Sequence, residues 1–196
     1  MGKIFYIMGK SASGKDHIYK RLLEDEQLHL NRIVLYTTRP VRKGELPGRE
    51  YYFIGEGALQ KLREQNKVIE SRSYDTIHGV WTYCTVDDGQ INLEKEDYLG
   101  IGTLESYEKL RNYYGKEALC PVYIEVEDGE RLGRALKREQ KQDIPKYAEM
   151  CRRFLADTDD FSEDKILKAG ISRRFLNNEA REICIKEIKE YIYMMR

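Results

Sequence analysis

Closely spaced cysteines, long apolar runs and an excess of charge of either sign are all missing from this chain. Its cysteines are far apart and lack the spacing of zinc ligands, so we expect reduced thiols and a cytoplasmic location. No apolar run approaches the length of a membrane-spanning helix, so no membrane partner is expected. The four cysteines are Cys84, Cys120, Cys151 and Cys184.

Positive and negative charges balance, with 34 Lys and Arg residues against 34 Asp and Glu residues. This balance argues against a general nucleic-acid binder, so any basic surface has a local role. The length of 196 residues suits one medium-sized domain, or a core with an inserted subdomain.

A glycine-bounded loop, G-K-S-A-S-G-K, directly follows the apolar run Ile4–Met8. A strand, such a loop and then a helix are typical of a phosphate-binding loop, in which backbone N–H groups, the helix N-terminus and Lys15 hold the phosphates of ATP. A surface turn rich in glycine and serine is the alternative. Asp16 stands where a Ser or Thr hydroxyl is expected to bind Mg²⁺. The predicted ATP-binding residues are Gly9, Ser11, Ala12, Ser13, Gly14, Lys15 and Asp16.

Strand-like and helix-like segments alternate along the chain, which predicts an α/β fold with a largely parallel sheet flanked by helices. We expect the core in residues 1–36 and 86–196, and an inserted subdomain with its own small mixed sheet in residues 37–85. A charged helical region, broken near Ile144–Pro145, follows the fourth core strand. The expected core strands are Lys3–Met8, Arg32–Tyr36, Asp97–Gly102, Leu119–Val126 and Ile171–Leu176, and the last helix is Asn178–Met195.

Three further motifs extend the phosphate-loop pattern: T-T-R-P-V-R at 37–42, G-R-E-Y-Y-F at 48–53 and V-I-E at 68–70. Their order and spacing resemble the guanylate kinase family of P-loop nucleoside monophosphate kinases. The resemblance implies a P-loop core, a small acceptor-binding subdomain and a helical lid at about 127–153. It also implies transfer of the γ-phosphoryl group of ATP to GMP, with Mg²⁺ as cofactor.

The resemblance assigns the acceptor site to the inserted subdomain. Arg39, Arg42 and Tyr51 are expected to hold the phosphate of the acceptor, since arginine forks suit a phosphate dianion. Glu70 is expected to accept hydrogen bonds from the guanine ring, and His78 to replace a missing tyrosine as a phosphate contact. The alternatives are a solvated basic loop, an ordinary carboxylate at a strand end and an incidental loop histidine.

Arginines also gather in the charged helical region. Arg131, Arg134 and Arg138 fall on one helical face, which is either a solvated face neutralised by acidic neighbours or a functional stripe. The resemblance implies that Arg134 and Arg138 belong to the lid, with Arg153, or Arg152 in a shifted register, on the next helix. Together with Lys15 and Arg39, the residues Arg134, Arg138 and Arg153 are the predicted catalytic groups.

The chain departs from the family pattern at several positions. Gly100 and Gly102 stand where aspartates that serve the metal and the acceptor are expected, while Leu35 and Val80 replace hydroxyl residues that contact the acceptor. We hypothesise that Asp16 supplies the missing carboxylate to Mg²⁺; the alternative is that it accepts backbone N–H bonds in the first helical turn. These departures leave two other functions open: a kinase for another nucleotide or a sugar phosphate, and a binding module with little turnover.

Overall fold

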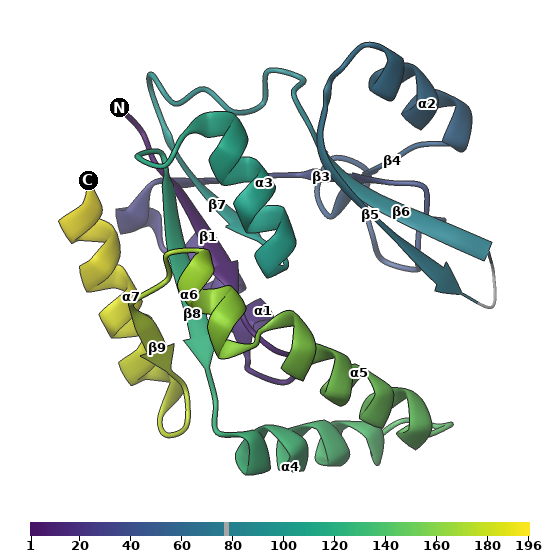
Figure 1. The fold of residues 1–196 in the computed structure, drawn as a ribbon, viewed down its shortest axis with the longest axis vertical. Helices are drawn as coiled ribbons and strands as arrows, with labels where there is room; N and C mark the ends of the chain where they lie inside the picture. The colour runs from purple at the N-terminus through teal and green to yellow at the C-terminus, as the bar shows by residue number, and fades with distance from the viewer. Residues whose placement is uncertain (77–78) are drawn as a thin grey trace.

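The computed structural model describes residues 1–76 and 79–196 and contains two separate sheets (Figure 1). The larger sheet has the strand order β2-β7-β1-β8-β9, and every neighbouring pair in it is parallel. The predicted α/β fold with a parallel sheet is therefore confirmed. The strands are β1 (Ile4–Met8), β2 (Leu30–Arg32), β7 (Asp97–Ile101), β8 (Leu119–Glu125) and β9 (Arg174–Leu176).

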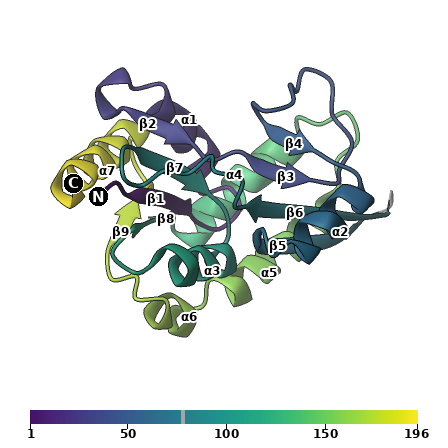
Figure 2. The ribbon, with the colours of Figure 1, turned by 90° about the horizontal axis from the view of Figure 1, so that it is seen from above.

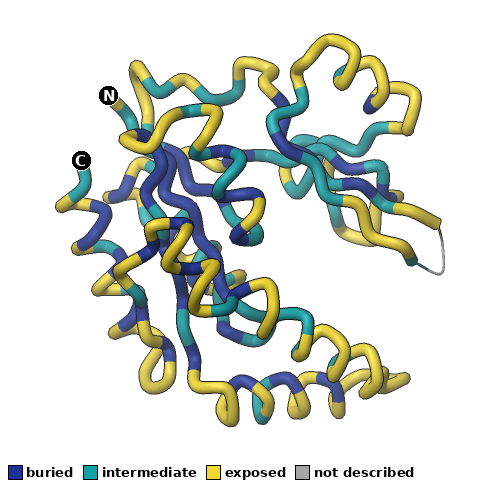
Figure 3. Tube along the Cα trace, viewed as in Figure 1, coloured by how far each residue is buried: buried dark blue, intermediate teal, exposed yellow. Residues whose placement is uncertain are grey.

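Helices cover both faces of this core sheet (Figure 2). Successive side chains of a strand point to opposite faces, so Phe5 and Ile7 pack on one side and Ile4 and Met8 on the other. The strands of the core are the most continuously buried part of the chain (Figure 3). Helices α1 (Lys15–Leu23) and α7 (Arg181–Met195) cover the first face, and α3 (Leu104–Tyr114) and α6 (Glu163–Lys168) cover the second.

The position of β1 determines where a ligand can bind. It pairs with β7 on one side and with β8 on the other, while the chain leaves its carboxyl end through the loop 9–14 into α1. In open parallel sheets, ligands bind outside the carboxyl ends of the strands, at the point where the order of the strands reverses. The predicted phosphate-binding loop therefore lies at the position where this fold class places its ligand sites.

The smaller sheet is mixed and has the order β4-β3-β6-β5, in which β3 and β4 are parallel and the other pairs are antiparallel. Leu59 of the helix α2 packs on this sheet with Cys84 and Val86. Figure 1 shows the small sheet projecting to one side of the core. Its elements are β3 (Leu35–Thr37), β4 (Tyr51–Phe53), α2 (Glu56–Glu64), β5 (Val68–Thr76) and β6 (Gly79–Val86).

A helix pair forms the third part of the molecule. Helices α4 (Asp128–Glu139) and α5 (Tyr147–Asp160) replace the single charged region, and the predicted break near Ile144–Pro145 is confirmed. The pair extends from the core on the same side as the small sheet (Figure 1). No helix in the described ranges has the length and apolar character needed to cross a bilayer. A short 3₁₀ helix, η1 (Glu26–Leu28), completes the core.

The prediction of one strand over Arg32–Tyr36 is wrong. The segment contributes to β2 in the core sheet and to β3 in the small sheet, and the chain passes from one sheet to the other at residues 33–34. The side-chain amide of Gln90 bonds both backbone groups of Val34, so Val34 does not pair with a neighbouring strand in either sheet. Its Oε1 accepts from the Val34 N–H at 2.8 Å, and its Nε2 donates to the Val34 carbonyl at 3.2 Å.

Tyr6 fills the space beside the two glycines at the end of β7. A Cβ atom on Gly100 would lie 2.5 Å from ring carbon Cδ2 of Tyr6, and one on Gly102 would lie 2.2 Å from its hydroxyl oxygen. That hydroxyl is 2.8 Å from the Oγ atom of Ser106 on α3. The ring and hydroxyl of Tyr6 therefore occupy the space that carboxylate side chains at positions 100 and 102 would need.

This packing predicts that Gly100→Ala destabilises the fold by about 1–3 kcal/mol, because the added methyl group overpacks the ring of Tyr6. Urea unfolding measures the change. In a Tyr6→Val background the added methyl should be tolerated, so the two costs should not add. Gly133→Ala is the matched control: Gly133 has no atom within 4 Å of its added Cβ, and a helical alanine should stabilise by about 0.5–1 kcal/mol. If the costs of Gly100→Ala and Tyr6→Val in free energy of unfolding simply add, the contact between these two residues is contradicted.

Candidate active site

The loop between β1 and α1 has the backbone of an anion-binding turn. Gly14 precedes α1 with φ of +86°, a left-handed conformation that favours glycine, and Ala12 also has a positive φ of +64°. The N–H of Ser13 donates to the carbonyl of Lys10 at 3.2 Å and closes the turn. Lys15 and Asp16 are the first two residues of α1, so both lie at the positive end of its dipole.

Asn177 supports this loop from the far end of the chain. It is buried directly after β9, and its Nδ2 donates to the carbonyl of Ser13 at 2.8 Å. Its backbone N–H bonds the carbonyl of Glu125, which continues the ladder between β8 and β9. The sequence prediction missed this residue. The only available signal was an asparagine at the carboxyl end of the last predicted strand.

The helix pair is tied to the loop through Asp157 of α5. Its carboxylate accepts from the N–H of Ser11 at 2.8 Å and forms an ion pair with Arg131 of α4 at 3.0 Å. Arg131 is completely buried, and its guanidinium lies 3.8 Å from the centre of the Phe154 ring. The arginine stripe therefore does not act as one surface, because its first member joins α4, α5 and the loop internally.

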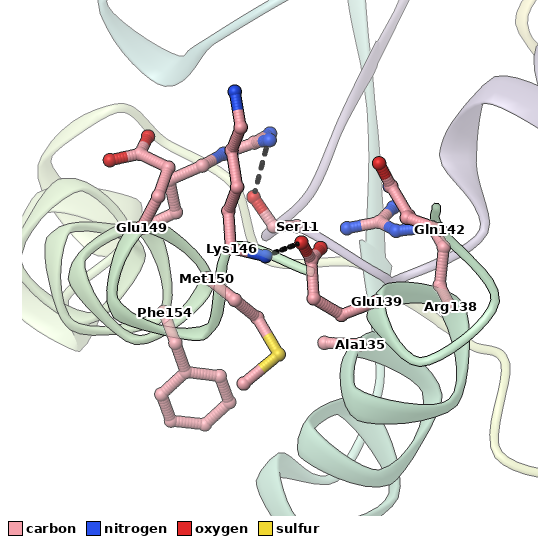
Figure 4. A pocket seen from close by; sticks show the side chains of 10 residues that line it. Ser11, Ala135, Arg138, Glu139, Gln142, Lys146, Glu149, Met150 and Phe154 are labelled. Carbon is pink, nitrogen blue, oxygen red and sulfur yellow. Dashed lines mark hydrogen bonds between the residues drawn. The ribbon is translucent and has the colours of Figure 1, made fainter. Parts of the chain in front are cut away.

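The other predicted lid arginines lie nearer the surface. Arg134 pairs with Glu130 at 3.0 Å and donates to the carbonyl of Asn177 at 2.8 Å. Arg138 and Arg153 line a pocket of about 170 Å³ between α4 and α5. Figure 4 shows Ser11 of the loop between the side chains of the two helices, and Nη2 of Arg153 lies 3.5 Å from its Oγ.

The alternative register for the last arginine can be compared directly. Arg152 points away from this pocket and forms an ion pair with Glu149 of its own helix at 2.7 Å. Arg153 lines the pocket together with Arg138 and Ser11. The geometry therefore favours Arg153 over Arg152 as a residue that can approach a ligand on the loop.

On the small sheet, Arg39 is buried and holds an internal anion. Its two terminal nitrogens donate to the two carboxylate oxygens of Glu45 at 2.9 and 2.8 Å, and its guanidinium lies over the rings of Tyr51 and Phe53. Glu45 also accepts from the N–H of Arg42 at 2.8 Å. The Arg39 guanidinium lowers the pKa of Glu45 from 4.5 to about 2. A planar anion thus occupies the fork that the sequence assigns to a phosphate.

Two of the remaining predicted acceptor residues, Tyr51 and Arg42, contact the pair of Arg39 and Glu45. Tyr51 is half-buried, whereas the Arg42 side chain is exposed, with its guanidinium 6.0 Å from the Trp81 ring centre. Glu70 is buried on β5. His78 lies outside the described residues, so its predicted role stays a prediction. Val80 is 55 % exposed.

Only one carboxylate stands at the predicted metal position. Asp16 is exposed in the first turn of α1, whereas Gly100 and Gly102 offer none and the space beside them holds Tyr6. Across residues 1–76 and 79–196, no three His, Cys, Asp or Glu side chains gather as a metal cluster. Mg²⁺ commonly uses one or two carboxylates together with substrate phosphates. A single carboxylate beside the loop fits an ion that arrives with ATP.

Comparison with known proteins supports the geometry. The sequence profile of the family described as guanylate kinase matches residues 1–167. The chain belongs to the guanylate kinase family. The guanylate kinase of Porphyromonas gingivalis is 29 % identical over 140 residues, which cover 70 % of this chain and 73 % of that protein. The guanylate kinase of Mycoplasma mobile is 39 % identical over 79 residues, or 40 % of this chain and 39 % of that protein.

A solved guanylate kinase has the same fold. The crystal structure of guanylate kinase from Anaplasma phagocytophilum superimposes with a TM-score of 0.69 and covers 98 % of this chain and 85 % of that one. The identity is 18 %, so this likeness concerns the fold alone.

The pair of Arg39 and Glu45 predicts a specific sensitivity to acid. Because the folded-state pKa of Glu45 lies below its ordinary value, the ionised form stabilises the fold above about pH 4.5, and this contribution is lost as the pH falls toward 2. Glu45→Gln should therefore be less stable than the parent chain at pH 7, and the gap should narrow in urea unfolding as the pH falls below 4. Glu24→Gln, which removes an exposed ion pair with Lys20, is the control, and its stability should differ little from that of the parent chain at either pH. An undiminished gap at low pH would contradict the ion pair.

Proposed function

We propose that this chain transfers the γ-phosphoryl group of ATP to GMP and releases ADP and GDP. The observation that carries the proposal is the buried fork of Arg39, which binds a planar anion through two parallel hydrogen bonds in the segment after β3, away from the phosphate loop. Arginine forks of this kind also suit the oxygens of a phosphate. Two anion sites on two parts of one chain are what a phosphotransferase with two phosphorylated substrates needs.

The phosphate loop provides the ATP side of the reaction. Backbone N–H groups of residues 9–16, the N-terminus of α1 and Lys15 bind the β- and γ-phosphates. Asp16 would hold the Mg²⁺ that is bound with ATP, and the ion would supply positive charge to offset that of the phosphates. Asp157 already accepts from the Ser11 N–H, which indicates that this part of the loop can stabilise an anion.

On the acceptor side, the phosphate of GMP takes the place of Glu45 on Arg39, with Arg42 and Tyr51 as further donors. An oxygen of that phosphate attacks the γ-phosphorus in line, and the bond from the γ-phosphorus to the bridging oxygen of ADP breaks. Lys15 and the lid arginines stabilise the charge that spreads over the transferred group. The proposed lid arginines are Arg134, Arg138 and Arg153.

The three parts of the fold have matching roles. We infer that residues 37–85 bind the acceptor, that residues 1–36 and 86–196 form the core, and that the lid at about 127–153 closes over the phosphates and excludes water. The ion pair between Arg131 and Asp157 supports this role of the lid, because it couples the helix pair to the phosphate loop. The described cysteines are all free thiols, which supports a cytoplasmic location.

A second acceptor remains a candidate on a specific observation. The carboxylate of Glu70, which the family resemblance assigns to guanine, forms an internal ion pair with Arg72. If that pair stays closed to guanine, another phosphorylated acceptor, such as a different nucleotide or a sugar phosphate, is the substrate. The glycines at the end of β7 favour the third possibility, a binding module with little turnover.

ADP formation from ATP, Mg²⁺ and a panel of monophosphates tests the proposal. We expect turnover that depends on GMP, and Lys15→Met should lower kcat by about 100-fold or more, because it removes a charge that stabilises the transferred group. Lys20→Met, on the exposed face of the same helix, is the matched control. Turnover with another acceptor alone supports the second candidate, and nucleotide binding without turnover supports the binding module.

The metal role of Asp16 predicts a change in Mg²⁺ dependence. Asp16→Asn keeps the shape of the side chain and removes its charge, so the Mg²⁺ concentration at half-maximal rate should rise about tenfold. Glu24→Gln, at the end of the same helix, should leave it unchanged. An unaltered titration in Asp16→Asn would show that Asp16 only caps backbone N–H groups in the first helical turn.

A further inference from the structure

Glu70 and Arg72 form a buried ion pair on one face of β5. The Glu70 side chain is fully buried, and its Oε1 accepts from the hydroxyl of Thr85 on β6 at 2.8 Å. The Nε atom of Arg72 lies 3.2 Å from Oε2 of Glu70, and its Nη2 lies 3.4 Å from Oε1. The Arg72 side chain keeps 11 % of its surface exposed, so it is the member of the pair that reaches the surface.

Two atoms of this pair have no hydrogen-bond partner among the described residues. They are Oε2 of Glu70 and Nε of Arg72, which face each other in an ion pair that is not aligned as a hydrogen bond. Leaving a buried acceptor and a buried donor unsatisfied is unfavourable, and such groups are uncommon in folded proteins. Both atoms are buried, so a ligand gains this acceptor and this donor only when the Arg72 side chain shifts.

We propose that Arg72 is a specificity-determining residue of the acceptor site, which together with Glu70 selects bases that carry an N–H group beside a C=O group. This inference rests on the proposed function. The N–H of the base donates to Oε2 of Glu70, and the neighbouring carbonyl accepts from the Arg72 guanidinium. Guanine and hypoxanthine share this edge, whereas adenine has an unprotonated ring nitrogen beside an amino donor and mismatches both groups.

The same pair weakens recognition of the amino group that distinguishes guanine from hypoxanthine. A free carboxylate could accept from the ring N–H with one oxygen and from the amino group with the other. Here Oε1 is already bonded to Thr85, and Arg72 neutralises the carboxylate charge. Among purine monophosphates, the acceptor class is therefore that of the 6-oxopurines, with little preference for GMP over IMP.

Binding measurements with GMP, IMP and AMP test this inference without relying on turnover. By titration calorimetry on the full chain, we expect GMP and IMP affinities within about tenfold of each other and AMP binding at least about 10³-fold weaker. Values of kcat/KM should follow the same order. A preference for GMP over IMP greater than tenfold, or AMP binding as tight as GMP binding, overturns the inference.

The variant Arg72→Met tests the role of the Arg72 guanidinium while leaving Glu70 in place. This substitution frees the Glu70 carboxylate to accept a hydrogen bond from the amino group of guanine, which hypoxanthine lacks. One hydrogen bond to a charged group corresponds to about tenfold or more in affinity, so the ratio of GMP to IMP affinity should rise by that factor. Arg63→Met on the exposed side of α2 removes the same charge from the same subdomain and should leave the ratio unchanged.

An unchanged ratio in Arg72→Met overturns the assignment. If this variant does not fold, as judged by circular dichroism, the preference of the parent chain between GMP and IMP decides alone. The expected order of binding without any ADP formation supports the role of Arg72 and contradicts the proposed function. No measurable binding of any of the three nucleotides overturns the inference.

Discussion

Groups that recognise phosphate are strongly polar, and burying them without partners is unfavourable. This chain satisfies such groups from its own side chains. Asp157 accepts from the loop N–H of Ser11, and Glu45 fills the fork of Arg39. In the third case the predicted ligand contact is an anion, Glu70, and its internal partner is the cation Arg72. These three predicted ligand contacts thus each have an internal partner, and a substrate must compete with that partner.

These pairs also connect parts of the chain that lie far apart in sequence. Asp157 and Arg131 join the helix pair to the loop after β1, and Asn177 joins the same loop to the last core strand. The phosphate loop is therefore held from two sides as well as by its own strand and helix. Displacement of Asp157 from Ser11 would also change how the helix pair is held, because Asp157 forms the ion pair with Arg131.

The sequence predicted the features that depend on local pattern: the loop at the end of β1, most of the strands and the helix break near Ile144–Pro145. It could not predict contacts that depend on distant partners. The division of residues 32–36 between two sheets follows from Gln90, and the burial of Arg131 follows from Asp157 and Phe154. On a helical wheel Arg131 is equivalent to its neighbours, and only the packing of α5 against α4 distinguishes it.

The bonds between Gln90 and Val34 have a mechanical consequence. The chain enters the small sheet through residues 33–34 and returns to the core through residues 87–96, so two segments carry this sheet. One amide side chain fastens the outgoing segment to the returning one. A rotation of the small sheet must bend both segments together or break two hydrogen bonds worth about 1 kcal/mol each.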